Sequence, residues 1–486
     1  MALNSFSFLI WFCGLFLVLL VIELLKKRIH SPLIQQSQPV VLLIFSYLTL
    51  FAVDWRFLLC VLLITAWTFA FGFFLGNAAA TVRKRLLLAA GITGILLSLG
   101  YFKYTNFFLT EVAALLGTTA QRIEIILPIG ISFYSFSAIS YLMDVYRKKY
   151  PPVTNALHFA LYIAFFPKFM SGPIVRGDVF FPQVKNYRGV TFKTATEGVQ
   201  IFVFGLFKKI VLADHLSVFV DDVFAAPSVF NTATVILAVI SYSLQIYFDF
   251  SGYSDMAIGI SKMIGFDFPA NFNLPYIANG FSDFWKRWHI SLSSWFQEYL
   301  YYPLGGSRKG RLRTYINLLI VMLVSGLWHG AGTTFLLWGL LHGVFSCAEH
   351  LLRQKKRSYN PLSISNLIRI IAVYAIVALL WVPFRADTVG GALAIWKCCF
   401  VPQSGVFQPY FWTFIAVFCL IVSTIYAVVK WKKECAGVAE GRPPINGSYP
   451  LLDLTSFVPL CLFFVFCGLT IILGYFGNTA FIYGKF

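Results

Sequence analysis

Residues 327–334 read Leu-Trp-His-Gly-Ala-Gly-Thr-Thr, and they separate two apolar runs at 314–331 and 334–351. A histidine inside hydrocarbon is costly unless it faces a cavity or takes part in chemistry, and the flanking glycines loosen the backbone. A buried neutral imidazole also needs partners for both of its nitrogens. His329 is therefore predicted to lie at a break between two membrane helices, either as a general base or as a residue that ties the helices together.

The composition is that of a polytopic membrane protein. Of the 486 residues, 59% are hydrophobic and only 12% are charged, and the mean hydropathy is +0.76. Several apolar runs are shorter than the roughly 20 residues that cross a bilayer. We therefore expect an all-α polytopic membrane protein with about 11–12 transmembrane or re-entrant helices. The apolar runs lie near 6–25, 39–53, 57–76, 86–103, 125–145, 196–214, 232–252, 314–331, 334–351, 365–384, 411–429 and 456–476.

Clusters of basic residues lie between the apolar runs and contribute to the net charge of +18. If the runs alternate across the membrane, every cluster falls on one side, whereas Asp54, Glu111 and Asp221-Asp222 fall on the other. This asymmetry predicts cytoplasmic basic loops and both termini outside the cytoplasm. The cations form no continuous face, so nucleic acid is not an expected partner, whereas membrane lipids are. The clusters are Lys26-Lys27-Arg28, Arg83-Lys84-Arg85, Arg147-Lys148-Lys149, the 286–313 loop, Arg353 to Arg357 and Lys430 to Lys433.

The nine cysteines sit mostly inside apolar segments, with no CxxC spacing and no histidine-rich companion. We interpret them as small buried hydrophobic residues rather than as disulfides or metal ligands, and no metal is expected. No basic residues precede the first apolar run, so we expect that run to remain in the protein as its first helix. The cysteines are at 13, 60, 347, 398, 399, 419, 435, 461 and 467.

Two carboxylates, Asp249 and Asp255, lie near the predicted cytoplasmic end of the apolar run 232–252, and Ser251 is one helical turn before Asp255. Intramembrane carboxylates can carry protons or orient a histidine. They can equally hydrogen-bond neighbouring loops and so support the structure.

The segment Phe281–Trp295 combines tryptophan, lysine and arginine in an amphipathic pattern. That composition is typical of a helix that lies in the headgroup layer of a membrane. His289 within it is either an interfacial histidine or part of a catalytic site.

The next segment, 301–313, packs four cations into six residues beside two glycines. It either holds the phosphates of a nucleotide-containing donor or anchors the chain at the cytoplasmic face.

Six strings occur in order along the chain, and together they resemble the membrane-bound O-acyltransferase (MBOAT) family. The resemblance is to its bacterial branch, which contains alginate O-acetyltransferases. It is strong over roughly residues 125–345 and rests on hydropathy elsewhere. The strings are Leu127–Tyr134, Phe166–Arg176, Tyr247–Asp255, Phe284–Trp295, Tyr301–Gly306 and Gly326–Gly330.

The resemblance implies transfer of an acyl group from a cytoplasmic thioester donor to a hydroxyl, through a catalytic funnel in a helical body. The family's intramembrane histidine matches His329, and its second histidine or asparagine position matches His289. In the bacterial branch the acceptor is an exported polysaccharide or cell-wall glycan, and a secreted or membrane-anchored esterase-like partner completes the transfer. The resemblance thus implies an O-acetyltransferase of the bacterial inner membrane. Within one integral membrane domain it divides the chain into N-terminal helices at 1–124, a catalytic core at 125–351 and C-terminal helices at 352–486.

We expect the nucleotide of acetyl-CoA to stay at the cytoplasmic mouth while its thioester reaches toward His329. His329 is the expected general base, and His289 is expected to position the donor or relay the proton. Residues expected to hold the donor are Lys286, Arg287, Arg308, Lys309 and Arg311, with Asp249, Asp255, Trp328 and Arg176 in support. Two alternatives remain. One is D-alanyl transfer from an acidic carrier protein to teichoic acid, and the other is a transporter of glycan or acyl groups with His329 in its path.

Overall fold

A computed structural model describes residues 3–29, 31, 34, 37–169, 172–352, 364–435 and 451–477, without the side chains of 427–435. The regular elements of these ranges are helical apart from one isolated bridge, between Phe230 and Val406. Among the described residues, seven helices are long and apolar enough to cross a membrane, and five more are apolar but shorter. The prediction of an all-α polytopic membrane protein is confirmed. The clusters at Arg353 to Arg357 and Lys430 to Lys433 lie outside the described side chains, as do Met170, Ser171 and Cys435.

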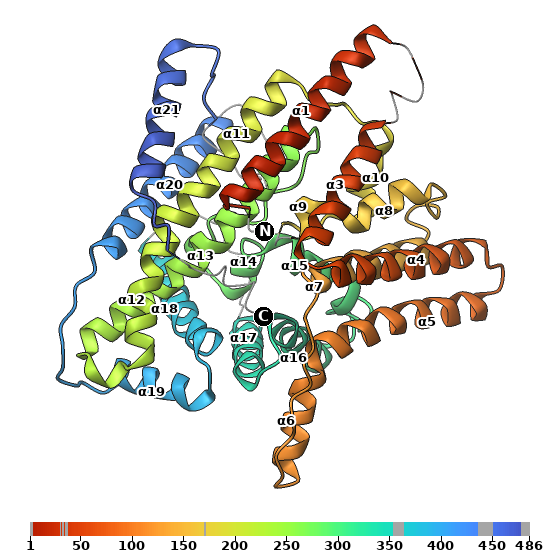
Figure 1. Ribbon diagram of the computed structural model, residues 1–486. Helices are drawn as coiled ribbons and strands as arrows, with labels where there is room; N and C mark the ends of the chain where they lie inside the picture. The colour runs from red at the N-terminus through yellow and green to blue at the C-terminus, as the bar shows by residue number, and fades with distance from the viewer. Residues whose placement is uncertain are drawn as a thin grey trace. The chain divides into compact units, whose positions relative to one another are not determined.

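The chain forms two compact units. The first unit comprises Met1–Phe202 and Asp255–Phe268, and the second comprises Val203–Ser254 and Pro269–Phe486. The first unit (Figure 1) contains α1 (Phe6–Arg28), α3 (Ser37–Val53), α4 (Trp55–Asn77), α5 (Thr81–Leu99), the π-helix η1 (Gly100–Tyr104), α6 (Thr105–Leu115), α7 (Ile131–Tyr146), α8 (Ala156–Ala164), α9 (Phe166–Phe169), α10 (Gly177–Lys185) and most of α11 (Phe192–Leu206). The catalytic core proposed at 125–351 includes residues of both units.

The second unit holds the helices that build the site. It contains the π-helix η2 (Phe207–Ala213), α12 (Asp214–Ala225), the short 3₁₀ segment η3 (Pro227–Val229), most of α13 (Thr232–Met263), η4 (Pro275–Ile277), α14 (Phe281–Trp285), α15 (Ile290–Phe296), η5 (Gln297–Tyr301), α16 (Arg311–His329), α17 (Thr333–Leu352), α18 (Ile364–Arg385), α19 (Val389–Phe400), α20 (Phe411–Cys435) and α21 (Phe457–Ile472). Its core is aromatic, and Trp288, Trp338 and Trp381 are each at most 1% exposed.

Some predicted boundaries were wrong. Helix α13 does not end near residue 252 but continues to Met263, which places Asp249 and Asp255 within the helix rather than at its end. Within this continuation Gly252 packs closely against the neighbouring backbone, because a Cβ there would lie 2.7 Å from the backbone oxygen of Gly205. Helix α19 was not predicted, because it is short and contains two glycines. The run 125–145 becomes helical only at Ile131, after Gly130 with φ 73°.

The predicted burial of cysteines holds for Cys60 and Cys398, and it is wrong for Cys13 and Cys461, which are exposed on apolar helices. All eight cysteines within the described residues are free thiols.

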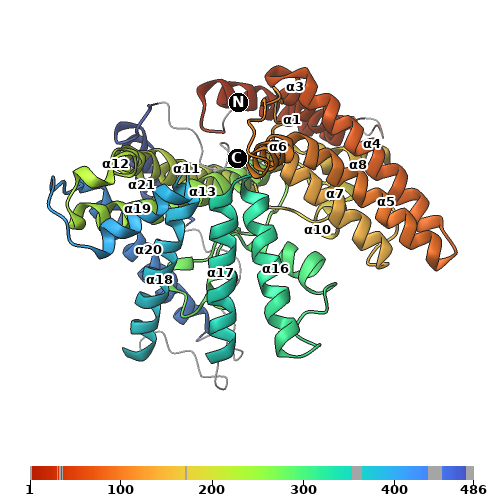
Figure 2. The ribbon, with the colours of Figure 1, turned by 90° about the horizontal axis from the view of Figure 1, so that it is seen from below.

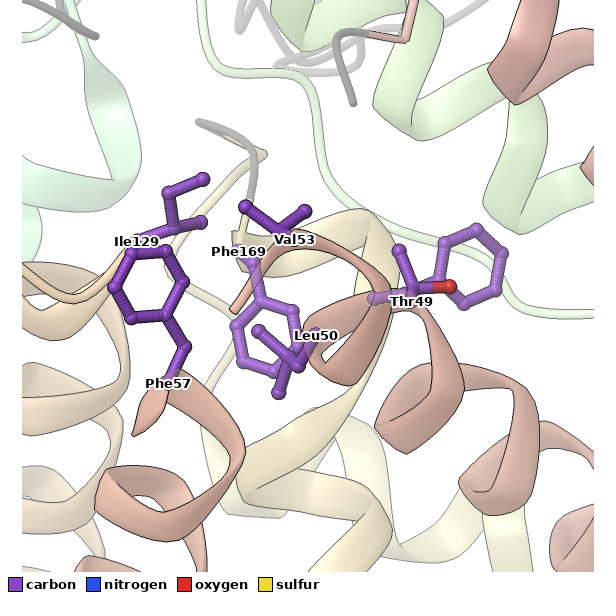
Figure 3. A pocket seen from close by; sticks show the side chains of 7 residues that line it. Thr49, Leu50, Val53, Phe57, Ile129 and Phe169 are labelled. Carbon is purple, nitrogen blue, oxygen red and sulfur yellow. The ribbon is translucent and has the colours of Figure 1, made fainter. Parts of the chain in front are cut away.

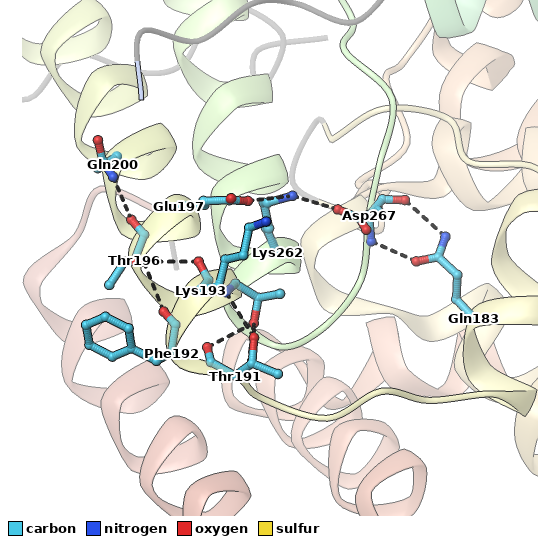
Figure 4. Close-up of polar contacts among 10 residues, drawn as sticks. Gln183, Thr191, Phe192, Lys193, Thr196, Glu197, Gln200, Lys262 and Asp267 are labelled. Carbon is cyan, nitrogen blue, oxygen red and sulfur yellow. Dashed lines mark hydrogen bonds and ion pairs between the residues drawn. The ribbon is translucent and has the colours of Figure 1, made fainter. Parts of the chain in front are cut away.

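Polar contacts connect α11 to the end of α13 in the first unit (Figure 4). Lys262 lies 3.1 Å from Glu197 and 2.9 Å from Asp267. The side chain of Gln183 accepts from the Asp267 amide and donates to its carbonyl, at 2.7 and 3.0 Å. This network fixes the chain where it leaves α13.

Helices α16 and α17 lie side by side and antiparallel (Figure 2). A Cβ at Gly326 would lie 2.2 Å from the backbone oxygen of Phe335, and one at Gly339 would lie 2.4 Å from that of Met322. Gly339 and Gly343 have the four-residue spacing of small residues that brings membrane helices together. The hairpin therefore depends on backbone contact at glycine.

We predict that Gly339→Ala lowers the free energy of unfolding by about 1–3 kcal/mol, because overpacking forces the two backbones apart. Thermal unfolding of the purified protein in detergent measures the effect. Gly14→Ala in α1 is the matched control, since a Cβ there meets nothing within 4 Å and alanine favours helix. A Gly339→Ala variant as stable as the wild type would contradict the contact.

Candidate active site

His329 is the last residue of α16, and it is 3% exposed. The helix ends there because Gly330 adopts an extended conformation while its amide still donates to the Gly326 carbonyl. The His329 ring meets Trp338 and Phe384 edge to face, at centroid distances of 5.1 and 5.2 Å. The break between two helices predicted around His329 is present, and it places the imidazole in an aromatic interior.

His289 lies in the turn between α14 and α15, and it is 1% exposed. Its φ of 42° is left-handed, which is uncommon for a residue with a Cβ and indicates a constrained turn. The expectation of one continuous amphipathic helix over Phe281–Trp295 was wrong. The chain breaks between α14 and α15, and the break turns Trp288 and His289 inward, so both are buried.

Asn271 fixes the orientation of His289. Its Oδ1 lies 3.2 Å from His289 Nδ1 and also accepts from the amide and hydroxyl of Ser291, at 3.2 and 2.9 Å. Its Nδ2 donates to Ser254 Oγ at 3.1 Å. Because Oδ1 can only accept, Nδ1 carries the proton and Nε2 carries the lone pair. Burial lowers the pKa of His289 to about 3, so the ring is neutral at physiological pH.

Trp328 connects the two histidines. Its ring centroid lies 6.1 Å from that of His289 and 5.0 Å from that of His329. Of the residues singled out in the sequence, the structure thus brings together His289, Trp328 and His329. A neutral histidine can accept a proton from a hydroxyl, so the arrangement is suited to general-base chemistry.

The predicted donor-binding cations of the second unit differ in their surroundings. Lys286, Arg308, Lys309 and Arg311 are exposed. Arg287 instead bonds Asp283 through Nε at 2.9 Å, and its Nη1 donates to the Asn273 carbonyl. The 302–310 turn is held by Asn317, whose amide donates to Gly306 O at 2.9 Å. The exposed cations can therefore meet an anion, whereas Arg287 supports the loop that carries His289.

Three of the four residues expected to support the site, Asp249, Asp255 and Arg176, differ in their surroundings. Asp249 forms a buried ion pair with Lys209, with Nζ and Oδ1 2.7 Å apart, which favours structural support over a proton carrier. Asp255 is buried and Arg176 half-buried, and both belong to the first unit. Within the described residues, no three His, Cys, Asp or Glu side chains gather as metal ligands.

A separate pocket in the first unit carries no chemistry (Figure 3). It is lined by Thr49, Leu50, Val53, Phe57, Ile129, Phe166 and Phe169. Its one hydroxyl, that of Thr49, donates to Phe45 O and accepts from the Trp11 indole.

Sequence reasoning missed Asn271, His342 and Lys209. His342 and Lys209 sit in apolar runs, so the argument applied to His329 would have found both. Asn271 lies in a polar connection where asparagine is common, and only the folded chain brings it to His289.

We predict that Asn271→Ala lowers the rate of the reaction that depends on His289 by about 10–100-fold, the usual effect of removing a group that orients a functional histidine. Acyl transfer by the purified protein, with thermal unfolding as a check on folding, measures it. Ser254→Ala is the control, because it removes only the acceptor of Asn271 Nδ2. Equal losses in both variants would contradict a specific role in orienting His289.

Comparison with known proteins identifies relatives of this chain. The profile described as MBOAT, membrane-bound O-acyltransferase family, matches residues 147–380. The probable alginate O-acetylase AlgI of Pseudomonas syringae pv. tomato is 40% identical over 363 residues, which cover 73% of this chain and 68% of the relative. The peptidoglycan O-acetyltransferase of Helicobacter pylori is 38% identical over 340 residues, or 65% and 64% of the two chains. The teichoic acid D-alanyltransferase of Bacillus subtilis is 28% identical over 263 residues, or 50% and 64%.

Proposed function

The chain belongs to the membrane-bound O-acyltransferase family and is a multi-pass membrane O-acyltransferase, and on that premise we propose that it O-acetylates an exported polysaccharide or cell-wall glycan. The donor is cytoplasmic acetyl-CoA, and the membrane is the bacterial inner membrane. Two relatives named as O-acetyltransferases of alginate and of peptidoglycan support a glycan acceptor. Both resemble this chain more closely than the D-alanyltransferase does, which favours acetyl over D-alanyl transfer.

The observation that carries the proposal is the pair of buried histidines on either side of Trp328. His329 removes the proton from the acceptor hydroxyl as its oxygen attacks the thioester carbonyl. The new C–O bond forms, the C–S bond breaks, and His329 returns the proton to the thiolate. His289, neutral and oriented by Asn271, positions the thioester or relays that proton.

The donor's polar part is proposed to stay outside the membrane. Lys286, Arg308, Lys309 and Arg311 are exposed and suited to the phosphates of coenzyme A. The positive-inside pattern supports a cytoplasmic position for this basic loop. Only the acetyl group then crosses the barrier, and an esterase-like partner outside the cytoplasm receives it and completes transfer to the glycan.

The test is acetyl transfer in proteoliposomes that carry the full chain. Labelled acetyl-CoA is placed on the side of the basic loop, and glycan with a candidate esterase-like partner is placed on the other. We expect label to pass from acetyl-CoA to the partner or glycan. A second assay replaces acetyl-CoA by a carrier protein that bears labelled D-alanine. Transfer from this carrier protein alone would overturn the acetyl proposal and favour the teichoic acid branch.

A further inference from the structure

His342 is a buried polar residue that the proposed mechanism does not use. It lies on α17 with a fully buried side chain, and neither Nδ1 nor Nε2 has a hydrogen-bond partner among the described residues. A buried polar group left without a partner costs about 1–3 kcal/mol. A buried group of this kind requires an explanation, and a ligand that both donates and accepts would supply the missing partners.

The surroundings of His342 are aromatic. Trp338 and Trp285 lie at centroid distances of 4.8 and 5.0 Å, and Phe284 stacks on the imidazole at 6.3 Å with an interplanar angle of 15°. The indole Nε1 atoms of Trp285 and Trp338 also have no acceptor within the described structure. The three rings therefore offer N–H donors and one imidazole lone pair in an otherwise apolar environment, which suits an uncharged ligand group that both donates and accepts.

His342 lies between the reaction centre and the basic loop. Because α16 and α17 are antiparallel, α17 leads away from His329 toward the Arg311 end of α16, where Tyr315 meets His350 at 5.6 Å. His342 lies about 14 Å along α17 from Thr333. One ring separates it from the reaction centre, since Trp338 contacts both His329 and His342. It thus lies on the side of the basic loop, from which the acyl donor enters in the proposed function.

The donor carries a group of the required kind. In coenzyme A and in acyl carrier proteins the thioester is attached to the same pantetheine arm, in which amides alternate with short hydrocarbon links. An amide donates through N–H and accepts through C=O, and the hydrocarbon links suit the aromatic walls. Proton transfer is a weaker assignment for His342, because the proton taken from the hydroxyl returns to the thiolate and no further relay is needed.

We propose that His342, with the indoles of Trp285 and Trp338, binds an amide of the acyl donor's pantetheine arm and so positions the thioester at His329. The site is distinct from the basic loop that holds the phosphates. This inference rests on the proposed function for the direction from which the donor enters.

The test measures binding to the full chain in lipid nanodiscs, so it does not require turnover. The ligands are coenzyme A, 4′-phosphopantetheine and adenosine 3′,5′-bisphosphate, which lacks the arm. In His342→Phe we expect affinity for the first two to fall about tenfold and affinity for the bisphosphate to stay unchanged. His342→Gln keeps a donor and an acceptor and should restore most of the affinity. His350→Phe, on the same helix, is the matched control and should bind all three as the wild type does.

A folded His342→Phe protein that binds coenzyme A and 4′-phosphopantetheine as tightly as the wild type would overturn the proposed site. The same conclusion would follow if affinity for the bisphosphate fell as much as affinity for the other two ligands. Turnover separates this result from failure of the proposed function. With S-ethyl thioacetate, which has no amide, His342→Phe should lose less activity than it loses with acetyl-CoA. If the wild type binds the arm but transfers only from a carrier protein, the acetyl-CoA proposal fails while the amide site stands.

Discussion

Replacing His329 by alanine is expected to lower acetyl transfer by about 10²–10⁴-fold, the usual contribution of a positioned general base. The His329 ring lies at the end of α16, where it meets Trp338 and Phe384 edge to face. The variant should lower kcat more than it raises the KM for acetyl-CoA, because the imidazole acts on the attacking hydroxyl. Initial rates with labelled acetyl-CoA in proteoliposomes give both constants.

Folding must be separated from chemistry in this experiment. His329→Gln keeps polar atoms near the ring position without a basic imidazole, and it should lose activity as alanine does while unfolding at the wild-type temperature. The double variant His289→Ala/His329→Ala should be hardly slower than His329→Ala alone, because residues that act as one unit lose function together. A correctly inserted His329→Ala protein that retains the wild-type rate would exclude His329 as the base.

Hydropathy predicted most of the helices, because bilayer thickness and backbone hydrogen bonding leave few alternatives for long apolar runs. It could not predict the π-helical segments η1, η2 and η5, since an extra residue in a turn leaves no hydropathy signal. It also placed the end of α13 too early, because polar Ser251 and Asp255 suggest a helix end although both are buried within the helix.

The site was predictable in its residue types but not in its partners. A histidine in an apolar run is conspicuous, so His329 could be identified from its neighbours alone. The sequence left His289 open between an interfacial and a catalytic histidine, because Trp, Lys and Arg occur together both at a membrane surface and in a buried turn. The folded chain shows that the His289 side chain is buried in a left-handed turn and hydrogen-bonded to Asn271.

Lys209→Met is expected to lower the free energy of unfolding by about 3–5 kcal/mol, the cost of breaking a buried ion pair from one side. Lys209 lies in η2, and its Nζ is 2.7 Å from Asp214 Oδ1 and 2.7 Å from Asp249 Oδ1, with all three side chains at most 4% exposed. Without the cation, two buried carboxylates are left to repel each other. The expected result is low yield and a lowered midpoint of thermal unfolding in detergent.

Two further variants make the test specific to the buried charges. Lys208→Met changes the neighbouring residue, a half-buried lysine whose Nζ lies 4.9 Å from the Phe204 ring centre. This variant should lower the free energy of unfolding far less than Lys209→Met does. The triple variant Lys209→Met/Asp214→Asn/Asp249→Asn removes all three charges and should regain much of the lost stability. It should also retain acyl transfer if Asp249 serves the structure. Restored folding without restored transfer would instead assign Asp249 a part in the reaction, as one interpretation of its sequence motif allows.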